Sequence, residues 1–439
     1  MKFVLISPQP INEEKPSRKF TAKRALTLFL TWSIIILVLS SLIVNTLHIN
    51  ESEEAYKAKV ESLLKEAVKV FEAIRGFPLE TVTVEVITIE WAKENWGKAY
   101  AEPDIANIRR EETIYKALFM ISESESLYEA KVEWWGMVIS AVWMNKIYVV
   151  REYFNPSDKF NAMKILIHEL THIMQSNFSV PYTPTFDGEK ARAALIEGDA
   201  RLMEEAYINE IWKKAVKLPF ATVKACEAYP EISFYGSEPS ALPKSISRLN
   251  YFPYEYGLKF VKALYSRGGW ETVNQAYLNP PTTTEQIIHP EKYLANETYK
   301  ETKSPTINEE GWQVLKNERF GEYFIFVMLA EWIPDEEASK AAEGWGGDKF
   351  TYYEKGNNYL FTWNITWDSA ANASEFFEAF KKMMWKVGAE EEDQNLWSKH
   401  GRYLSLIMEG ASTIIIGSDD KTLVQNIVAE LASLQVASS

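Results

Sequence analysis

The run His168-Glu169-Leu170-Thr171-His172 is the part of this sequence whose residue types and spacing are best suited to chemistry. Two imidazoles four residues apart, with a carboxylate next to the first, form the H-E-x-x-H arrangement of zinc hydrolases. On a helix these three side chains fall within a sector of about 100°. The neighbouring Leu, Ile and Met residues fall on the opposite side and suit burial. The run therefore predicts a helix that buries one face and presents two metal ligands and a base on the other.

A third ligand is expected, because catalytic zinc usually has three protein ligands and leaves the fourth position to water. Glu197, in Ala-Leu-Ile-Glu-Gly-Asp-Ala, is the best candidate, since it lies on the next predicted helix. Cys226 is the only cysteine, which excludes an intramolecular disulfide and a cysteine-based zinc site. We therefore expect one Zn²⁺ per chain, held by His168, His172 and Glu197.

An H-E-x-x-H helix followed by a glutamate on the next helix resembles the gluzincin metallopeptidases, over roughly residues 140–295. The resemblance implies hydrolysis by a water whose pKa is lowered by zinc, with Glu169 as general base. Thermolysin-like members carry an aspartate four residues after the ligand glutamate, where this chain has Arg201. Asp199 is rotated by about 200° from Glu197 on a helix, which favours a structural role for it. The sequence therefore leaves the residues that orient the ligands open.

Two residues compete to stabilise the oxyanion that develops during peptide hydrolysis. Tyr254 stands in a Y-x-x-G run that resembles the Y-E-K-G segment of gluzincin aminopeptidases, whose tyrosine has this role. His289 follows an Asn-Pro-Pro turn farther along the chain. The alternatives are a packed aromatic side chain and a loop histidine held by hydrogen bonds. No G-x-M-E-N run precedes the zinc helix, so exopeptidase activity is not supported.

The bulk composition describes a folded chain with an acidic surface. Of the 439 residues 46% are hydrophobic, which excludes a disordered chain. The net charge is −14, and no basic stripe interleaved with aromatic residues interrupts it. We therefore expect no nucleic-acid partner, and a peptide or protein as substrate.

The amino-terminal segment predicts a membrane anchor. Residues 25–44 contain no charged side chain, and their length as a helix is about 30 Å, the thickness of the hydrocarbon core of a bilayer. Basic residues precede this stretch and acidic residues follow it, so the amino terminus is expected in the cytoplasm and the rest outside it. We expect a cytoplasmic basic tail at 1–24 and an uncleaved signal anchor at 25–47, rather than a cleaved signal peptide. The protein is thus predicted to be a single-pass protein of the cell membrane.

The remainder predicts two domains, and the expected fold class is α+β, with an N-terminal transmembrane helix. Residues 50–319 are expected to form a metallopeptidase-like domain with a mixed sheet and a helical lobe. Residues 320–439 predict an accessory domain of ββαββα type, in which a turn at Gly344-Trp345-Gly346-Gly347-Asp348 precedes the first of these strands. Its expected strands are 350–354, 360–367, 403–408 and 413–416, and its expected helices are 376–386 and 422–434.

These patterns favour a membrane-anchored, extracytoplasmic zinc peptidase with Glu169 as general base. The alternative from another class is a surface binding or structural protein with a vestigial or purely structural zinc site. Glu169 favours the enzyme, because a structural site has no use for a base.

Overall fold

The computed structural model describes residues 52–181, 183–215, 242–305, 307 and 310–438. The chain divides into two compact units, Met1–Ala58 and Lys59–Ser439. Most of the first unit lies outside the described residues. The features below belong to the second unit, with the exception of the first turns of helix α2 (Glu53–Arg75).

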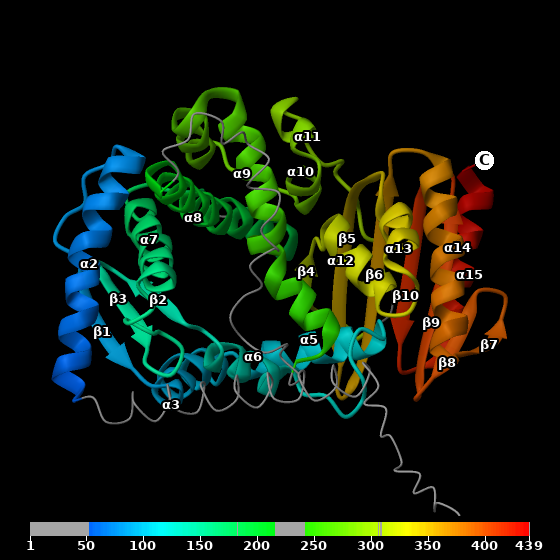
Figure 1. The fold of residues 1–439 in the computed structure, drawn as a ribbon. Helices are drawn as coiled ribbons and strands as arrows, with labels where there is room; N and C mark the ends of the chain where they lie inside the picture. The colour runs from blue at the N-terminus through cyan, green and yellow to red at the C-terminus, as the bar shows by residue number, and fades with distance from the viewer. Residues whose placement is uncertain (1–51, 182, 216–241, 306, 308–309, 439) are drawn as a thin grey trace, which may run out of the picture. The chain divides into compact units, whose positions relative to one another are not determined.

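A small mixed sheet leads to the H-E-x-x-H helix (Figure 1). Strand β1 (Thr83–Ile87) pairs in parallel with β3 (Lys146–Val150), and β2 (Ser140–Trp143) pairs with β3 in antiparallel fashion. The order β1-β3-β2 leaves β2 at an edge of the sheet. Short helices connect β1 to β2: α3 (Ile89–Ala92), η1 (Lys93–Lys98), α4 (Ala99–Ala101), α5 (Ile105–Ala117) and α6 (Leu127–Gly136).

Three long helices follow the sheet. Helix α7 (Lys159–Gln175) carries the H-E-x-x-H run, α8 (Phe186–Ala215) carries Glu197, and α9 (Lys244–Leu278) carries Tyr254. Helix α9 is interrupted at Gly268 and Gly269, where the backbone leaves helical geometry. Two short helices, α10 (Thr284–Ile288) and α11 (Pro290–Leu294), complete this part.

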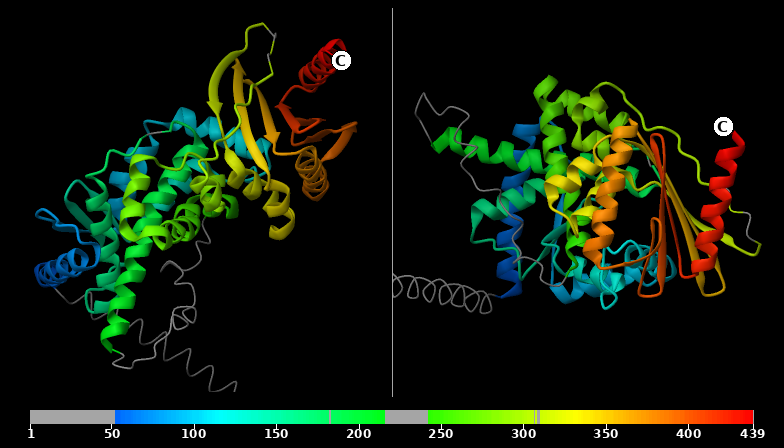
Figure 2. Two further views of the ribbon diagram at one scale, coloured as in Figure 1. Left: turned by 90° about the horizontal axis from the view of Figure 1, so that it is seen from above. Right: turned by 90° about the vertical axis from the view of Figure 1, so that its right-hand side faces the viewer.

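A seven-stranded antiparallel sheet forms the C-terminal part, in the order β4-β5-β6-β10-β9-β8-β7. Helices α14 and α15 lie on opposite faces of it (Figure 2). The strands are β4 (Gln313–Glu318), β5 (Trp345–Lys355), β6 (Asn358–Trp367), β7 (Glu390–Asp393), β8 (Leu396–Lys399), β9 (Arg402–Glu409) and β10 (Ser412–Ser418). The helices are α12 (Gly321–Ala330), α13 (Asp335–Ala342), α14 (Ala370–Val387) and α15 (Lys421–Ser438).

Strand β6 shows why the sheet needs helices on both faces. Phe361, Trp363 and Ile365 are fully buried in the cluster that includes α14, while Leu360 is buried in a second cluster with α15. Since successive side chains of a strand point to opposite faces, both faces of the sheet exclude water. The larger cluster continues into α8, α9 and α12, so that one hydrophobic core joins the C-terminal sheet to the helices of the H-E-x-x-H half.

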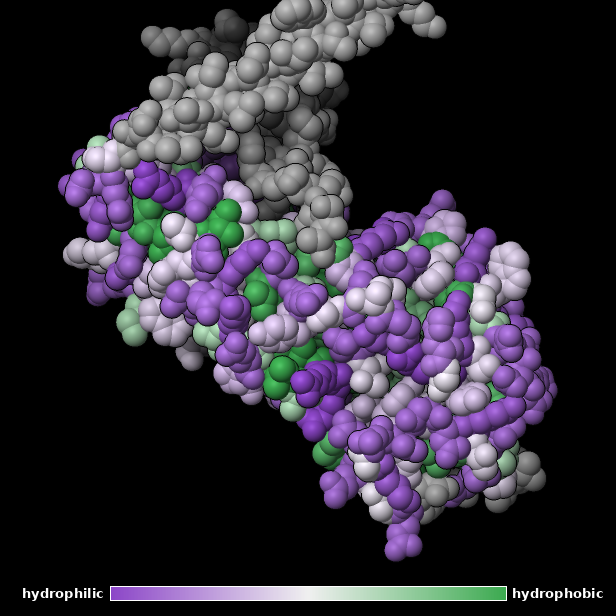
Figure 3. All heavy atoms as spheres, turned by 90° about the horizontal axis from the view of Figure 1, so that it is seen from below, coloured by the Kyte–Doolittle hydropathy of each residue, from purple (hydrophilic) through white to green (hydrophobic). Residues whose placement is uncertain are grey.

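Hydrophilic side chains dominate the face of the molecule drawn in Figure 3, and the hydrophobic side chains there are dispersed in small patches. Dispersed apolar side chains are normal on a protein surface.

The predicted fold class, an α+β chain with an N-terminal transmembrane helix, is wrong. The described residues form a mixed α/β structure in which no helix is long and apolar enough to cross a membrane. The long helices α8 and α9 carry charged side chains along their length, because they cover a core on one side only. Helix α12 is the most apolar, but its ten residues span about 15 Å, half the hydrocarbon core of a bilayer.

The predicted tail at 1–24 and signal anchor at 25–47 lie outside the described residues. The location outside the cytoplasm therefore stays a prediction. The expected boundary at residue 320 also stays a prediction, although the C-terminal sheet begins earlier, with β4 at Gln313.

Candidate metal centre

Helix α7 presents both histidines from one face. Its first turn is capped by Asp158, whose side chain accepts a hydrogen bond from the Asn161 N–H. Leu166 and Leu170 are fully buried on the opposite side of the helix. Packing of that side fixes the rotation of α7, so the H-E-x-x-H face is turned toward α8.

Helix α8 brings Glu197 to the two histidines. Its Oε2 lies 3.3 Å from His168 Nε2 and 3.5 Å from His172 Nε2, and the two Nε2 atoms are 3.0 Å apart. Ligand atoms about 2.0–2.1 Å from a tetrahedral zinc ion lie about 3.3 Å from one another. The three atoms therefore have the spacing of one face of a zinc coordination tetrahedron, and these residues form a group able to hold a metal ion.

His168 is oriented by Glu204, which lies on α8 two turns after Glu197. Its Nδ1 donates to Glu204 Oε1 at 2.8 Å, since a carboxylate only accepts. The other oxygen of Glu204 accepts from Arg201 Nη1 at 2.8 Å. With the proton held on Nδ1, Nε2 is the ring atom directed at the centre, and its lone pair would be available to a metal ion there.

His172 is oriented by Gln175. The amide nitrogen of Gln175 donates to the Ile196 carbonyl and to the Tyr277 hydroxyl, at 2.8 and 2.9 Å. The amide oxygen must therefore be the atom 2.7 Å from His172 Nδ1, which again places the ring proton there.

A buried network holds Gln175 in turn. The Tyr277 hydroxyl donates to Asp199 Oδ2 at 2.6 Å, and Arg75 donates to the same oxygen at 3.0 Å. The structural role that the sequence favoured for Asp199 is therefore not its whole role, because this network ends at His172. Asp199 acts on His172 through two intervening side chains.

The arrangement favours a cation at its centre. Both Nε2 atoms and Glu197 Oε2 face one another, and Glu197 Oε2 is buried without a hydrogen-bond partner among the described residues. Burial lowers the pKa of His168, but the carboxylates of Glu197 and Glu204 raise it to about 10. Burial raises the pKa of Glu197, but His172 and His168 hold it well below its usual range. The carboxylates therefore favour positive charge on the histidine pair, and a bound Zn²⁺ would supply that charge in place of protons.

Glu169 lies beside these ligands on the wall of a cavity. Its Oε1 accepts from the Ser140 hydroxyl of edge strand β2 at 2.7 Å, while Oε2 is buried without a hydrogen-bond partner. The cavity has a volume of about 130 Å³, and His168, Glu169, Ser140 and Tyr254 line it together with apolar side chains. One side of the ligand group is therefore open to a small molecule or a side chain.

Tyr254 belongs to the same site. Burial raises its pKa well above the usual range, and the adjacent carboxylates of Glu197 and Glu169 raise it further. The hydroxyl therefore keeps its proton and is a hydrogen-bond donor at neutral pH. The structure brings together five of the six predicted site residues.

His289, the sixth predicted residue, does not join them. It lies between α10 and α11, and its Nε2 is 3.1 Å from Glu322 Oε1 on α12. This contact raises the pKa of His289. His289 does not line the cavity beside the histidine pair, so its place in the structure is a polar contact between helices.

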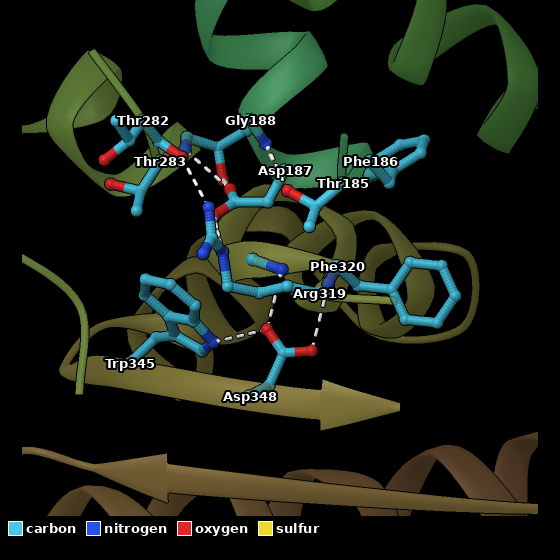
Figure 4. A network of polar contacts seen from close by, with 12 residues as sticks. Thr185, Phe186, Asp187, Gly188, Thr282, Thr283, Arg319, Phe320, Trp345 and Asp348 are labelled. Carbon is cyan, nitrogen blue, oxygen red and sulfur yellow. Dashed lines mark hydrogen bonds and ion pairs between the residues drawn. The ribbon is translucent and has the colours of Figure 1, made fainter. Parts of the chain in front are cut away.

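The start of α8 is fixed by buried polar contacts to the C-terminal half (Figure 4). Asp187 accepts from Arg319 Nε at 2.9 Å and from the N–H and hydroxyl of Thr284 at 2.6 and 2.7 Å. Arg319 also donates to the Thr282 carbonyl. This network anchors the helix that supplies Glu197.

Asp348 of β5 extends this anchor. It accepts from the N–H groups of Phe320 and Gly321 and from the indoles of Trp345 and Trp363, at 2.9–3.0 Å. Burial raises its pKa to about 6, although the backbone donors oppose the shift. The predicted turn at Gly344–Asp348 is therefore largely part of strand β5, in which Asp348 has a structural role.

A second group of acidic side chains, Glu285, Glu297 and Asp368, also lies close together. The Lys292 ammonium lies 2.6, 2.9 and 3.3 Å from their oxygens. A lysine already supplies the positive charge there, so we assign no metal to this group.

Sequence reasoning missed the residues that orient the ligands. Glu204 follows Glu197 by seven residues, which places it on the same face of α8 and was a usable signal. Gln175 follows His172 by three residues on α7 and could have been found in the same way. Ser140 gave no signal, because its contact with Glu169 depends on how β2 packs against α7.

The similarity to a known family lies in the C-terminal sheet. Residues 312–427 match the model of a family described as a domain of unknown function (DUF8575). This match begins just before β4 and ends within α15, and it contains none of the candidate metal ligands. No curated protein and no solved structure matches the chain.

Proposed function

We propose that the protein is a zinc-dependent peptidase that hydrolyses peptide bonds of a peptide or protein substrate. One Zn²⁺ per chain is held by His168, His172 and Glu197. The observation that carries the proposal is the unpaired, buried Oε2 of Glu169 on the cavity wall beside these ligands. A carboxylate oxygen left without a donor in such a place suits a group that receives a proton.

Bound zinc supplies Lewis acidity, which lowers the pKa of a coordinated water and polarises the scissile carbonyl. Glu169 accepts the proton of the attacking water and returns it to the leaving amine. Ser140 holds the other oxygen of Glu169 and so fixes its direction. Tyr254 donates to the oxyanion that develops on the carbonyl.

Strand β2 supports a peptide as substrate. It is an edge strand of its sheet, and its first residue, Ser140, contacts Glu169 through the side-chain hydroxyl. An extended peptide can add to such an edge through main-chain hydrogen bonds.

The alternative, a binding protein with a structural zinc site, fits the site less well. Structural zinc sites usually have four protein ligands. Within the described part of the chain only one carboxylate, that of Glu197, is placed to share a metal ion with the histidine pair, and a cavity lies next to this group. Glu169 would also be left without a role.

Metal analysis and hydrolysis of an unfolded protein by the full chain test the proposal. Glu169→Gln should retain one zinc per chain and lose at least about 10³-fold in kcat, because the amide cannot accept the proton. Glu197→Ala should lose most of its zinc. Glu205→Gln is the matched control, since Glu205 lies on the same helix and pairs with Lys262 at the surface. Full hydrolysis by Glu169→Gln would show that the base is wrongly assigned, and full zinc content in Glu197→Ala would show the same of the third ligand.

A further inference from the structure

The cavity beside the candidate metal centre has apolar walls and cationic side chains. Trp134, Met137 and Ile165 line it, and so do Lys164 and Arg201. Its volume of about 130 Å³ is close to the ~150 Å³ of a protein cavity that holds one benzene molecule. The cavity therefore has room for one side chain or one chain end.

The two cations lie at one end of this space. Lys164 precedes His168 by four residues on α7, and Arg201 follows Glu197 by four residues on α8. Each cation is therefore displaced by about 6 Å along its helix from the candidate metal ligand on that helix. Lys164 and Arg201 both approach the same oxygen, Glu204 Oε2, which shows that the two displacements have the same direction.

Lys164 and Arg201 share a single carboxylate oxygen, Glu204 Oε2. The Lys164 ammonium is buried, and among the described residues its only carboxylate oxygen within 4 Å is Glu204 Oε2, at 3.9 Å. That oxygen already accepts from Arg201, and the other oxygen of Glu204 accepts from His168. Asp158, the next acidic group, is engaged in capping α7.

Arg201 shows the same deficit. Its Nε is buried and has no acceptor among the described residues. A buried cation without a full set of acceptors is costly, and such sites commonly take their missing partner from a ligand. The missing partner here is an anion with two acceptor oxygens.

We propose that this cavity is a carboxylate subsite, so that the enzyme prefers substrates with a carboxylate adjoining the scissile bond. The carboxylate belongs to a glutamate or aspartate side chain or to a free chain end. Its apolar stem packs against Trp134 and Ile165, and its oxygens pair with Lys164 and Arg201. The proposal rests on the peptidase function proposed above and adds the substrate class.

Hydrolysis of matched peptides gives the first test. Two peptides with blocked ends differ only in Glu or Gln next to the scissile bond, and a third carries Gln and a free carboxyl end there. For the full chain loaded with zinc we expect kcat/KM to be about tenfold higher with the carboxylate than with the amide, mainly through KM. A gain confined to the third peptide would assign the subsite to a chain end. Equal kcat/KM for all three would overturn the proposal.

Lys164→Met tests the assigned cation, because methionine keeps much of the length and removes the charge. The ratio of kcat/KM for the Glu peptide to kcat/KM for the Gln peptide, both measured on the same variant, should fall to about one. Lys159→Met is the matched control, since Lys159 lies on the same helix and pairs with Glu66 at the surface. A preference that survives in Lys164→Met would overturn the assignment.

A binding test separates this proposal from the peptidase function. Immobilised Glu169→Gln protein is loaded with zinc and exposed to blocked hexapeptide mixtures that contain either Glu or Gln at one fixed position. We expect the Glu mixture to be retained about tenfold more than the Gln mixture, and this difference to disappear when Lys164→Met is added. That result would support the subsite even if the parent showed no hydrolysis. If the parent hydrolyses peptides but neither assay shows a preference for Glu over Gln, the proposed peptidase function would stand and the proposed carboxylate subsite would be overturned.

Discussion

Gly198 and Gly257 lie against each other where α8 and α9 cross. A Cβ on Gly198 would be 2.2 Å from the Gly257 carbonyl oxygen, and a Cβ on Gly257 would be 2.2 Å from the Ala194 carbonyl oxygen. Backbone atoms cannot rotate away, so this approach requires glycine on both helices. Because Glu197 adjoins Gly198, and Tyr254 precedes Gly257 by one turn, the crossing sets the distance between the third ligand and the tyrosine.

Gly257→Ala should therefore damage both stability and the site. We expect the free energy of unfolding to fall by about 1–3 kcal/mol, as in other overpacked cores, with weaker zinc binding because Glu197 is displaced. Denaturant unfolding and zinc titration measure the two effects. Lys259→Ala, an exposed position on α9, is the control. Unchanged zinc affinity in Gly257→Ala would show that the crossing does not position Glu197.

Glu204→Gln should weaken zinc binding without removing a ligand. The neutral amide is a poorer partner for His168 Nδ1, and loss of such an orienting carboxylate commonly costs about 10–100-fold in metal affinity. Competition with a chelator of known affinity measures the change. Glu205→Gln should bind zinc as the parent does. Equal affinities of the two variants would contradict the assigned role.

Tyr254→Phe should lower kcat by about 10²–10³-fold and leave zinc content and KM nearly unchanged, since the hydroxyl acts on the developing oxyanion. Steady-state kinetics on a peptide substrate measures this. Tyr256→Phe, whose ring stacks on Phe252, is the control and should keep its activity. A normal kcat in Tyr254→Phe would show that another group donates the hydrogen bond to the oxyanion.

Asp348 should make stability depend on pH. Its folded-state pKa is raised to about 6 by burial, so the native state holds the proton more tightly than the unfolded chain. The stabilisation is fully present below pH 3.8 and is lost as the pH rises through about 6. Asp348→Asn should remove this dependence, so the difference in unfolding free energy between parent and variant should change by about 2 kcal/mol between pH 4 and 7. A difference that stays constant over this range would contradict the shift.

Local periodicity was sufficient for the helical face of the site. His168, Glu169 and His172 share that face because their angular positions depend only on their spacing in a helix. The same holds for alternating strands such as β6, whose period of two residues is visible in the sequence. Most of the predicted C-terminal strands and helices overlap with observed ones, whereas β4, β7 and β8 were missed, because they are short or have no alternating pattern.

Contacts between distant segments could not be read in this way. Gly347 lies in a strand and not in a turn because it pairs with Thr366 of β6. The position needs glycine because Lys300 O lies 2.2 Å from where a Cβ would be. His289 contacts Glu322 and not the histidine pair, because of the way α10 and α12 pack.

The sequence by itself determined which side chains are able to bind a metal and activate water, because that depends on residue type and on spacing within one helix. Only the tertiary structure decided which residues fix the two ring protons and which side of the candidate ligands stays open. Those properties depend on how α8, α9 and β2 pack against α7. Packing is set by the whole core and not by any one segment.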